Sequence, residues 1–178
     1  MLQKRNDFEI IEFLRKEPAH IRKIARELKL IPSTVMRLVK RLESELVLDV
    51  TYEGRNAKYF LKTTPEAKAY LFMVEEYRRI AWLNHPEFRM LFKNLIELTQ
   101  GELIILFGSH VKGYAKKESD IDLFVETKSK ALKEKIENIS DKLSVHIGSL
   151  GSTSGFGREI INNHIILQNV ARFYRLIQ

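Results

Sequence analysis

The stretch from residue 103 to residue 126, LIILFGSHVKGYAKKESDIDLFVE, constrains the fold more than any other part of the chain. The apolar run Leu103–Phe107 ends abruptly at Gly108-Ser109, and a basic segment follows. Asp120-Ile121-Asp122 then opens a second apolar run at residues 123–125. Because side chains alternate along a strand, Asp120 and Asp122 are expected on one face and Ile121 on the other. The pattern predicts two neighbouring strands joined by a basic connection.

The acids and the glycine-serine pair indicate what these strands bind. Two carboxylates on one strand face repel each other, and a divalent cation removes that repulsion. Mg²⁺ takes hard oxygen ligands and is usually shared with the phosphates of a substrate. Gly108-Ser109 supplies backbone N–H groups and a hydroxyl, which suit a phosphate at the start of a helix. The stretch therefore predicts nucleotide chemistry.

Taken together, Gly108-Ser109 and the Asp120-Ile121-Asp122 triplet between two apolar strands resemble the signature of polymerase-beta-type nucleotidyltransferases, in particular their minimal archaeal and bacterial members. The resemblance covers about residues 87–178 and is specific through residue 126. It implies that Asp120 and Asp122 are catalytic and bind Mg²⁺. It also implies that Gly108 and Ser109 bind the phosphates of a nucleoside triphosphate, with Lys112 adding a positive charge.

The chain departs from this family at a third carboxylate, which the resemblance places on a later strand and which helps to activate the acceptor. The expected strand is Leu143–Ile147, where the matching position falls on His146 or Ser144, and neither is an acid. Loss of a positioned general base typically slows transfer by about 10²–10⁴-fold. His146 is a possible base, although a histidine that merely lines the pocket is the simpler interpretation.

The first third of the chain predicts three helices and a β-hairpin. Helices are expected at 6–16, 19–29 and 33–45, with Ser33 as the N-cap of the third, and strands at 46–52 and 58–63. This order resembles a winged helix-turn-helix, which implies that the third helix enters the major groove of double-stranded DNA and that the hairpin lies against the backbone or minor groove. The expected DNA-binding residues are Ser33, Thr34, Arg37, Lys40, Arg41, Arg55 and Lys58.

Charge supports a polyanionic partner for this part of the chain. Residues 1–63 hold 14 Lys and Arg against 9 Asp and Glu, so +5 of the net charge of +7 lies there. The alternatives are a small helical domain whose basic face is only solvated, and a winged helix that binds another protein.

Residues 64–100 predict a helical linker with helices at about 65–83 and 87–98. Its apolar positions, among them Tyr70, Val74, Tyr77 and Ile80, favour a homodimer, because such a stripe must be buried. Beyond the 103–126 stretch we expect a helix at 129–142, a strand at 143–150, a loop at 148–157, and helices at 158–164 and 169–176. The fold class is therefore α+β with several domains: a winged helix at 1–63, the linker at 64–100 and a nucleotidyltransferase-like domain with a small mixed sheet at 101–178.

Composition narrows the remaining choices. The chain has no cysteine, and its apolar runs are too short for a membrane span, so we expect a cytoplasmic protein without membrane contact. Three functions fit: a DNA-binding transcriptional regulator whose nucleotidyltransferase-like domain senses Mg²⁺-nucleotide or is a weak enzyme, an active nucleotidyltransferase acting on a protein, small molecule or nucleic acid, and an antitoxin-like minimal nucleotidyltransferase. The missing third acid and the fused DNA-binding domain favour the first.

Overall fold

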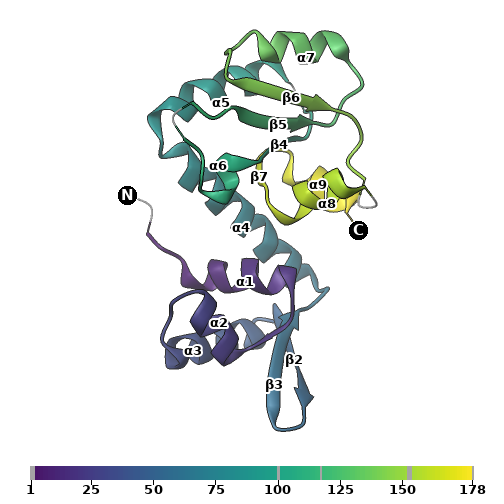
Figure 1. Ribbon diagram of the computed structural model, residues 1–178. Coiled ribbons are helices and arrows are strands. Elements are labelled where there is room, and N and C mark those ends of the chain that lie inside the picture. The colour runs from purple at the N-terminus through teal and green to yellow at the C-terminus, as the bar shows by residue number, and fades with distance from the viewer. Residues whose placement is uncertain (1–2, 100, 117, 152–153, 178) are drawn as a thin grey trace. The chain divides into compact units, whose positions relative to one another are not determined.

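The computed structural model describes residues 3–99, 101–116, 118–151 and 154–177 (Figure 1). The chain divides into two compact units, Met1–Val74 and Glu75–Gln178. The division falls inside helix α4 (Pro65–Leu83), so the predicted 64–100 linker is shared between the units instead of forming a region of its own. In the described part of the chain, no helix is long and apolar enough to cross a membrane.

The first unit is a winged helix. Its elements are α1 (Asn6–Lys16), β1 (Ala19–His20), α2 (Ile21–Glu27), α3 (Pro32–Ser44), β2 (Leu48–Glu53) and β3 (Asn56–Leu61). The three strands form an antiparallel sheet in the order β1-β3-β2. Figure 1 shows the hairpin β2–β3 extending away from the three helices. The predicted helix–helix–helix–hairpin order is confirmed.

The core of this unit follows from helical periodicity. The apolar face of α3, residues 35, 38, 39 and 42, is buried, and α3 packs on α1, whose buried face is formed by Phe8, Ile10, Ile11 and Leu14. Apolar residues three and four positions apart form a stripe that a helix buries against its neighbours. The stripe therefore fixes the side of α3 that is left for solvent or a ligand.

The cap, the short strand and the loop of this unit differ from the sequence-based expectations. Pro32 occupies the first helical position of α3, so Ile31 is the N-cap and the predicted N-cap role of Ser33 is wrong. The segment 19–29 opens with β1, which pairs with β3, before α2 begins. The hairpin loop is only Gly54-Arg55, because Glu53 pairs with Asn56. A glycine with φ of 62° at the first loop position suits a type II′ turn, which needs positive φ there.

The second unit contains a four-stranded mixed sheet. Its elements after α4 are α5 (Pro86–Leu98), β4 (Ile104–Phe107), α6 (Ser109–Lys112), β5 (Ile121–Val125), α7 (Lys130–Glu137), β6 (Leu143–Ile147), α8 (Gly155–Asn162), β7 (Ile165–Gln168) and α9 (Val170–Leu176). The strand order is β6-β5-β4-β7, with β5 and β6 parallel and the other pairs antiparallel. The predicted small mixed sheet is confirmed.

The two faces of this sheet differ in character. One face packs Ile104, Leu106, Leu123 and Val145 against α5 and α7 in a continuous apolar core. The other face, which begins one residue along each strand, carries Phe107, Asp122, Phe124, Ser144 and His146. Polar side chains therefore gather on the face that α5 and α7 do not cover.

A buried polar cluster ties α4 to the end of the chain within the second unit. Glu75 and His164 are fully buried, and His164 Nε2 lies 3.1 Å from Glu75 Oε1. Tyr174 donates to the same oxygen at 3.1 Å. The other ring nitrogen of His164 lies 2.9 Å from the carbonyl oxygen of Ile161, which can only accept, so this nitrogen carries a proton. Buried charges of this kind depend on their partners.

Four segments of this unit differ from expectation. The helix predicted at 129–142 ends at Glu137, and the strand at 143–150 ends at Ile147. Helix α8 begins at Gly155, inside the predicted loop at 148–157, and its N-cap Ser154 accepts from the N–H of Gly157 at 2.9 Å. Residues 165–168, left without an assignment between two predicted helices, form β7 beside β4.

Candidate nucleotide site and candidate nucleic-acid interface

Gly108 lies where β4 turns into α6 and brings the backbone against Asp122. Its φ of 74° and ψ of −149° belong to a region that residues with a side chain rarely adopt. A Cβ atom built on Gly108 would lie 2.1 Å from Asp122 Oδ2. Only glycine permits this approach, so the predicted phosphate-binding turn and the predicted metal ligand meet at one place.

The two predicted metal ligands lie at the start of β5. Asp120 immediately precedes the strand and is exposed, whereas Asp122 is its second residue, is half-buried and pairs with Phe107 of β4. Within the described residues no group of three or more His, Cys, Asp or Glu is placed to hold a metal ion. Two carboxylates still fit Mg²⁺, which keeps several waters and is commonly bound by one or two carboxylates together with phosphates.

β6, the strand next to β5, is the strand on which the third acid was expected. Ser144 pairs with Asp122 and His146 pairs with Phe124, so both predicted candidates lie on the Asp122 face. The exposed His146 ring packs against Phe107 and Phe156, with ring centroids 5.5 Å and 5.3 Å away. The histidine therefore belongs to an aromatic cluster beside the carboxylates.

The acid that directly follows β5 is already paired within the fold. Glu126 is 8% exposed and follows Asp122 and Phe124 at alternate positions. Its Oε2 lies 2.5 Å from Nε of Arg172 in α9. The carboxylate is therefore neutralised by a residue of the fold and is not available as a third ligand.

Lys112, the predicted phosphate contact, has an acidic partner. Its Nζ donates to Oε1 of Glu159 in α8 at 2.7 Å, and this hydrogen bond raises the pKa of Lys112. A phosphate bound by Lys112 has to share the ammonium group with Glu159 or displace it. Sequence reasoning missed both Glu159 and Phe156 because α8 begins inside a glycine-rich segment that indicates a loop by composition.

The candidate nucleic-acid interface lies on the outer side of α3 and on the hairpin. Ser33, Arg37 and Lys40 of α3 are exposed and Thr34 is half-buried, while Arg55 is exposed at the tip of the hairpin. These positions place hydroxyl and guanidinium donors on the face of α3 opposite the core, as contact with a phosphate backbone requires.

Three of the seven predicted DNA contacts have acidic partners in the same unit. Lys40 bonds Glu43 at 2.7 Å, and this raises the pKa of Lys40. Lys58 bonds Glu53 across the hairpin at 2.8 Å, and this lowers the pKa of Glu53. Exposed pairs of this kind are weak and can exchange partners.

Arg41 is different because its partner is buried. Its Nη2 lies 2.7 Å from Oδ2 of Asp7, which is 4% exposed and also accepts two hydrogen bonds from Arg5. Burial acts to raise the pKa of Asp7, but the hydrogen bonds and charges of Arg5, together with the charge of Arg41, outweigh it and lower the pKa. Arg41 thus has a structural role, and its removal would disturb the unit itself.

Part of the second unit is similar to a known protein family. A family model described as a nucleotidyltransferase domain matches residues 88–161, which include the Gly108-Ser109 turn and both carboxylates. The match supports the nucleotidyltransferase-like assignment of this unit and does not extend to the polymerase-beta type. No match was found among curated proteins.

Solved structures similar to the chain include regulators. A point mutant of Lactococcus lactis ZitR is 16% identical, with 55% of this chain and 62% of that chain covered at a TM-score of 0.37. The adhesin competence repressor AdcR of Streptococcus pyogenes is 16% identical over 53% and 66%, at 0.35. Wild-type ZitR in complex with DNA is 19% identical over 52% and 62%, at 0.36. TM-scores this low carry no argument about this chain.

Proposed function

We propose that the chain is a DNA-binding transcriptional regulator whose second unit binds a Mg²⁺-nucleoside triphosphate as a signal. The observation that carries the proposal is the contact between Gly108 and Asp122, which sets the glycine-serine turn directly against one of the two carboxylates. The nucleotidyltransferase match at 88–161 supports the assignment of phosphate and metal roles to these residues.

In this proposal Asp120 and Asp122 hold Mg²⁺, which neutralises phosphate charge when it is bound. Ser109 offers its hydroxyl and backbone N–H to the terminal phosphates. Helix α6 has only four residues, so its dipole adds little and the turn itself provides most of the donors. Lys112 contributes a charge once it releases Glu159.

The same site lacks the third carboxylate that nucleotidyl transfer is expected to need. Activation of an acceptor needs a base, and Ser144 and His146 occupy the strand positions where an acid would serve. A second candidate function, slow nucleotidyl transfer with His146 as base, is favoured by the exposure of His146 on the Asp122 face.

Calorimetric titration with ATP tests the nucleotide site. We expect Mg²⁺-dependent binding by the full chain that disappears in the Asp120→Asn, Asp122→Asn double variant. Asp141→Asn is the matched control, because Asp141 is an exposed acid in the turn between α7 and β6. Absence of Mg²⁺-dependent binding by the unaltered chain refutes the nucleotide part of the proposal.

A transfer assay separates the sensor from the enzyme. With α-labelled ATP, transfer to the protein, to DNA or to a cell lysate should remain near background. The His146→Asp variant should raise it if the missing acid is what limits the reaction. Efficient transfer by the unaltered chain would establish the second candidate function instead.

DNA binding is tested through Arg37 and Arg55, which are exposed on α3 and on the hairpin. In fluorescence anisotropy with duplex DNA, Arg37→Gln, Arg55→Gln should weaken binding and reduce the slope of log K against log salt by about 2, since each lost phosphate contact removes roughly one. Lys128→Gln, Lys130→Gln in the second unit controls for the loss of two positive charges, because both lysines are exposed. A salt-independent affinity refutes the DNA part of the proposal.

We also propose that the chain forms a homodimer through residues 66–98. Much of the apolar stripe is already buried, since Ala67, Val74 and Trp82 are at most 6% exposed. Met73, Ile80 and Met90 remain 43%, 46% and 65% exposed. Light scattering should give about twice the chain mass of 20.9 kDa, and a monomer at high concentration would refute the dimer.

A further inference from the structure

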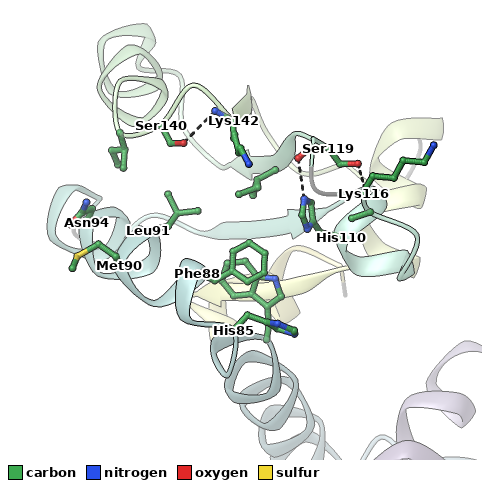
Figure 2. Close-up of a pocket in the computed structure, with 14 residues that line it drawn as sticks. His85, Phe88, Met90, Leu91, Asn94, His110, Lys116, Ser119, Ser140 and Lys142 are labelled. Carbon is green, nitrogen blue, oxygen red and sulfur yellow. Dashed lines mark hydrogen bonds between the residues drawn. The ribbon is translucent and has the colours of Figure 1, made fainter.

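A cavity of about 810 Å³ lies in the second unit, on the sheet face opposite the carboxylates. It is bounded by the end of α4, by α5, and by the segments that lead into β5 and β6, and Figure 2 shows the residues that line it. Ile121 lines the cavity, whereas Asp122, the next residue, faces the other side of the sheet. The cavity and the candidate nucleotide site are therefore two different places.

The wall of the cavity is apolar and partly aromatic. Trp82, Phe88 and Leu91 are 6–8% exposed and belong to the core of the unit. The rings of Trp82 and Phe88 stack with centroids 4.2 Å apart and planes 13° apart, and His110 meets Phe88 edge-on at 5.6 Å. A wall of this kind binds the flat or apolar body of a small molecule.

The rim is basic. The described residues that line the cavity include two lysines, two histidines and no Asp or Glu. In Figure 2, Lys142 and His110 lie on the same side of the Phe88 ring, and Lys116 lies farther out with its side chain directed away from that ring. Without a carboxylate the lining cannot anchor Mg²⁺, so its charge favours an organic anion over a Mg²⁺-nucleotide.

The wall also contains a buried hydrogen-bond donor. The Trp82 indole N–H is buried and has no hydrogen-bond partner among the described residues. Leaving a buried donor without an acceptor is unfavourable. An oxygen atom of a bound ligand would recover this free energy, and an aliphatic or purely aromatic hydrocarbon would not.

We propose that this cavity is a binding site for a small amphipathic anion, with an apolar or aromatic body against Trp82, Phe88 and Leu91 and an oxyanion head held by Lys142. A volume of about 810 Å³ falls within the range of about 300–1,000 Å³ that is usual for small-molecule sites. The head group is a carboxylate, sulfonate or phosphate monoester, which share the oxygen acceptors that an ammonium group and an indole N–H bind.

The probe for the test is 1-anilinonaphthalene-8-sulfonate, which has an aromatic body and one sulfonate. Trp82 is the only tryptophan in the chain, so energy transfer from Trp82 to the probe reports binding next to this wall. We expect saturable binding of one probe per chain with unchanged near-UV circular dichroism. The neutral analogue N-phenyl-1-naphthylamine should bind at least about tenfold more weakly, because it lacks the head group.

Two variants test where the sulfonate and the aromatic body of the probe bind. Lys142→Gln should weaken probe binding about tenfold, and Ala115→Phe should block it by filling the cavity, since Ala115 is part of the lining. Lys130→Gln, an exposed lysine of α7 outside the lining, is the matched control and should change nothing. Equal affinity of Lys142→Gln and Lys130→Gln, or equal affinity for the charged and neutral probes, overturns the proposal.

Variants of the candidate nucleotide site distinguish the failure of this proposal from the failure of the proposed function. Asp120→Asn, Asp122→Asn should lose Mg²⁺-ATP and retain the sulfonate probe, because neither acid lines the cavity. Displacement of the probe by Mg²⁺-ATP from the unaltered chain would show a shared site and overturn the proposal.

Discussion

Replacement of Gly108 by alanine is the perturbation that most directly tests the geometry of the candidate nucleotide site. The backbone at Gly108, with φ of 74° and ψ of −149°, costs a residue with a side chain about 1–3 kcal/mol. The new Cβ would also lie 2.1 Å from Asp122 Oδ2, so the carboxylate has to leave its position. Moving it off its rotamer adds about 0.5–1.5 kcal/mol. We expect a total loss of about 1.5–4.5 kcal/mol in the free energy of unfolding.

Gly113 provides a matched control five residues away. It has φ of 78° in the left-handed region, but a Cβ built there meets nothing within 4 Å. Gly113→Ala should therefore cost only about 1–2 kcal/mol, from backbone strain alone. Urea unfolding of the full chain, followed by far-UV circular dichroism, measures both variants. Gly108→Ala should also lose Mg²⁺-ATP binding, whereas Gly113→Ala should retain it.

A double-mutant cycle isolates the clash from the strain. If Asp122 causes the second part of the cost, then Gly108→Ala combined with Asp122→Ala should lose less stability than the sum of the single changes, by about 0.5–1.5 kcal/mol. Additive effects, together with equal costs for Gly108→Ala and Gly113→Ala, would show that the turn and the carboxylate are not in contact and would refute the reasoning.

Three further predictions concern charged groups with identified partners. The pKa of Asp7 is lowered in the folded state, so the contribution of Asp7 to stability is fully present above about pH 4 and is lost as the pH falls through the folded-state pKa. Asp7→Asn should remove that part of the acid dependence of stability, measured by urea titrations at pH 2–6. An unchanged acid dependence would contradict the assignment. His164→Leu removes one of the partners of the buried Glu75, which keeps Tyr174 and Arg78, and should cost about 1–3 kcal/mol, whereas adding Glu75→Leu should recover part of the loss in thermal unfolding. Glu159→Gln frees the lysine in α6 and should tighten Mg²⁺-ATP binding by up to about fivefold in calorimetry, because the phosphate no longer competes with an exposed and weak ion pair. A weaker affinity would show that Glu159 assists the site.

Periodic and positional signals were enough to predict most elements. The predictions of a helix near 33–45, of a helix that starts near residue 65 and of a strand on each side of the 108–120 segment agree with the structure. The helix near 33–45 buries an apolar stripe, and Thr64 accepts from the N–H of Ala67 at the start of α4. These signals are local, since a helix stripe or an N-cap is decided by residues within a few positions. The close approach of Gly108 and Asp122 agrees with the predicted meeting of turn and acids.

The features that sequence reasoning missed depend on residues far apart in the chain. β1 is only two residues long and exists because Ala19 and His20 pair with β3. Residues 165–168 are apolar in a row, and only pairing with β4 decides that they form a strand and not a helix. The partners of Lys112 and Arg41, Glu159 and Asp7, lie 47 and 34 positions away, and no local pattern indicates them.

The order of strands in the second sheet has a consequence for synthesis on the ribosome. β4, β5 and β6 follow one another closely in the chain, whereas β7, which covers the other edge of β4, is made after α8. Until β7 emerges, the apolar strand β4, all of whose residues are buried in the folded unit, presents an unpaired edge. Unpaired apolar edges join other chains, so the interval between β6 and β7 is when the nascent chain is most exposed to aggregation. A chaperone that covers this edge until β7 is made should therefore raise the yield of folded protein.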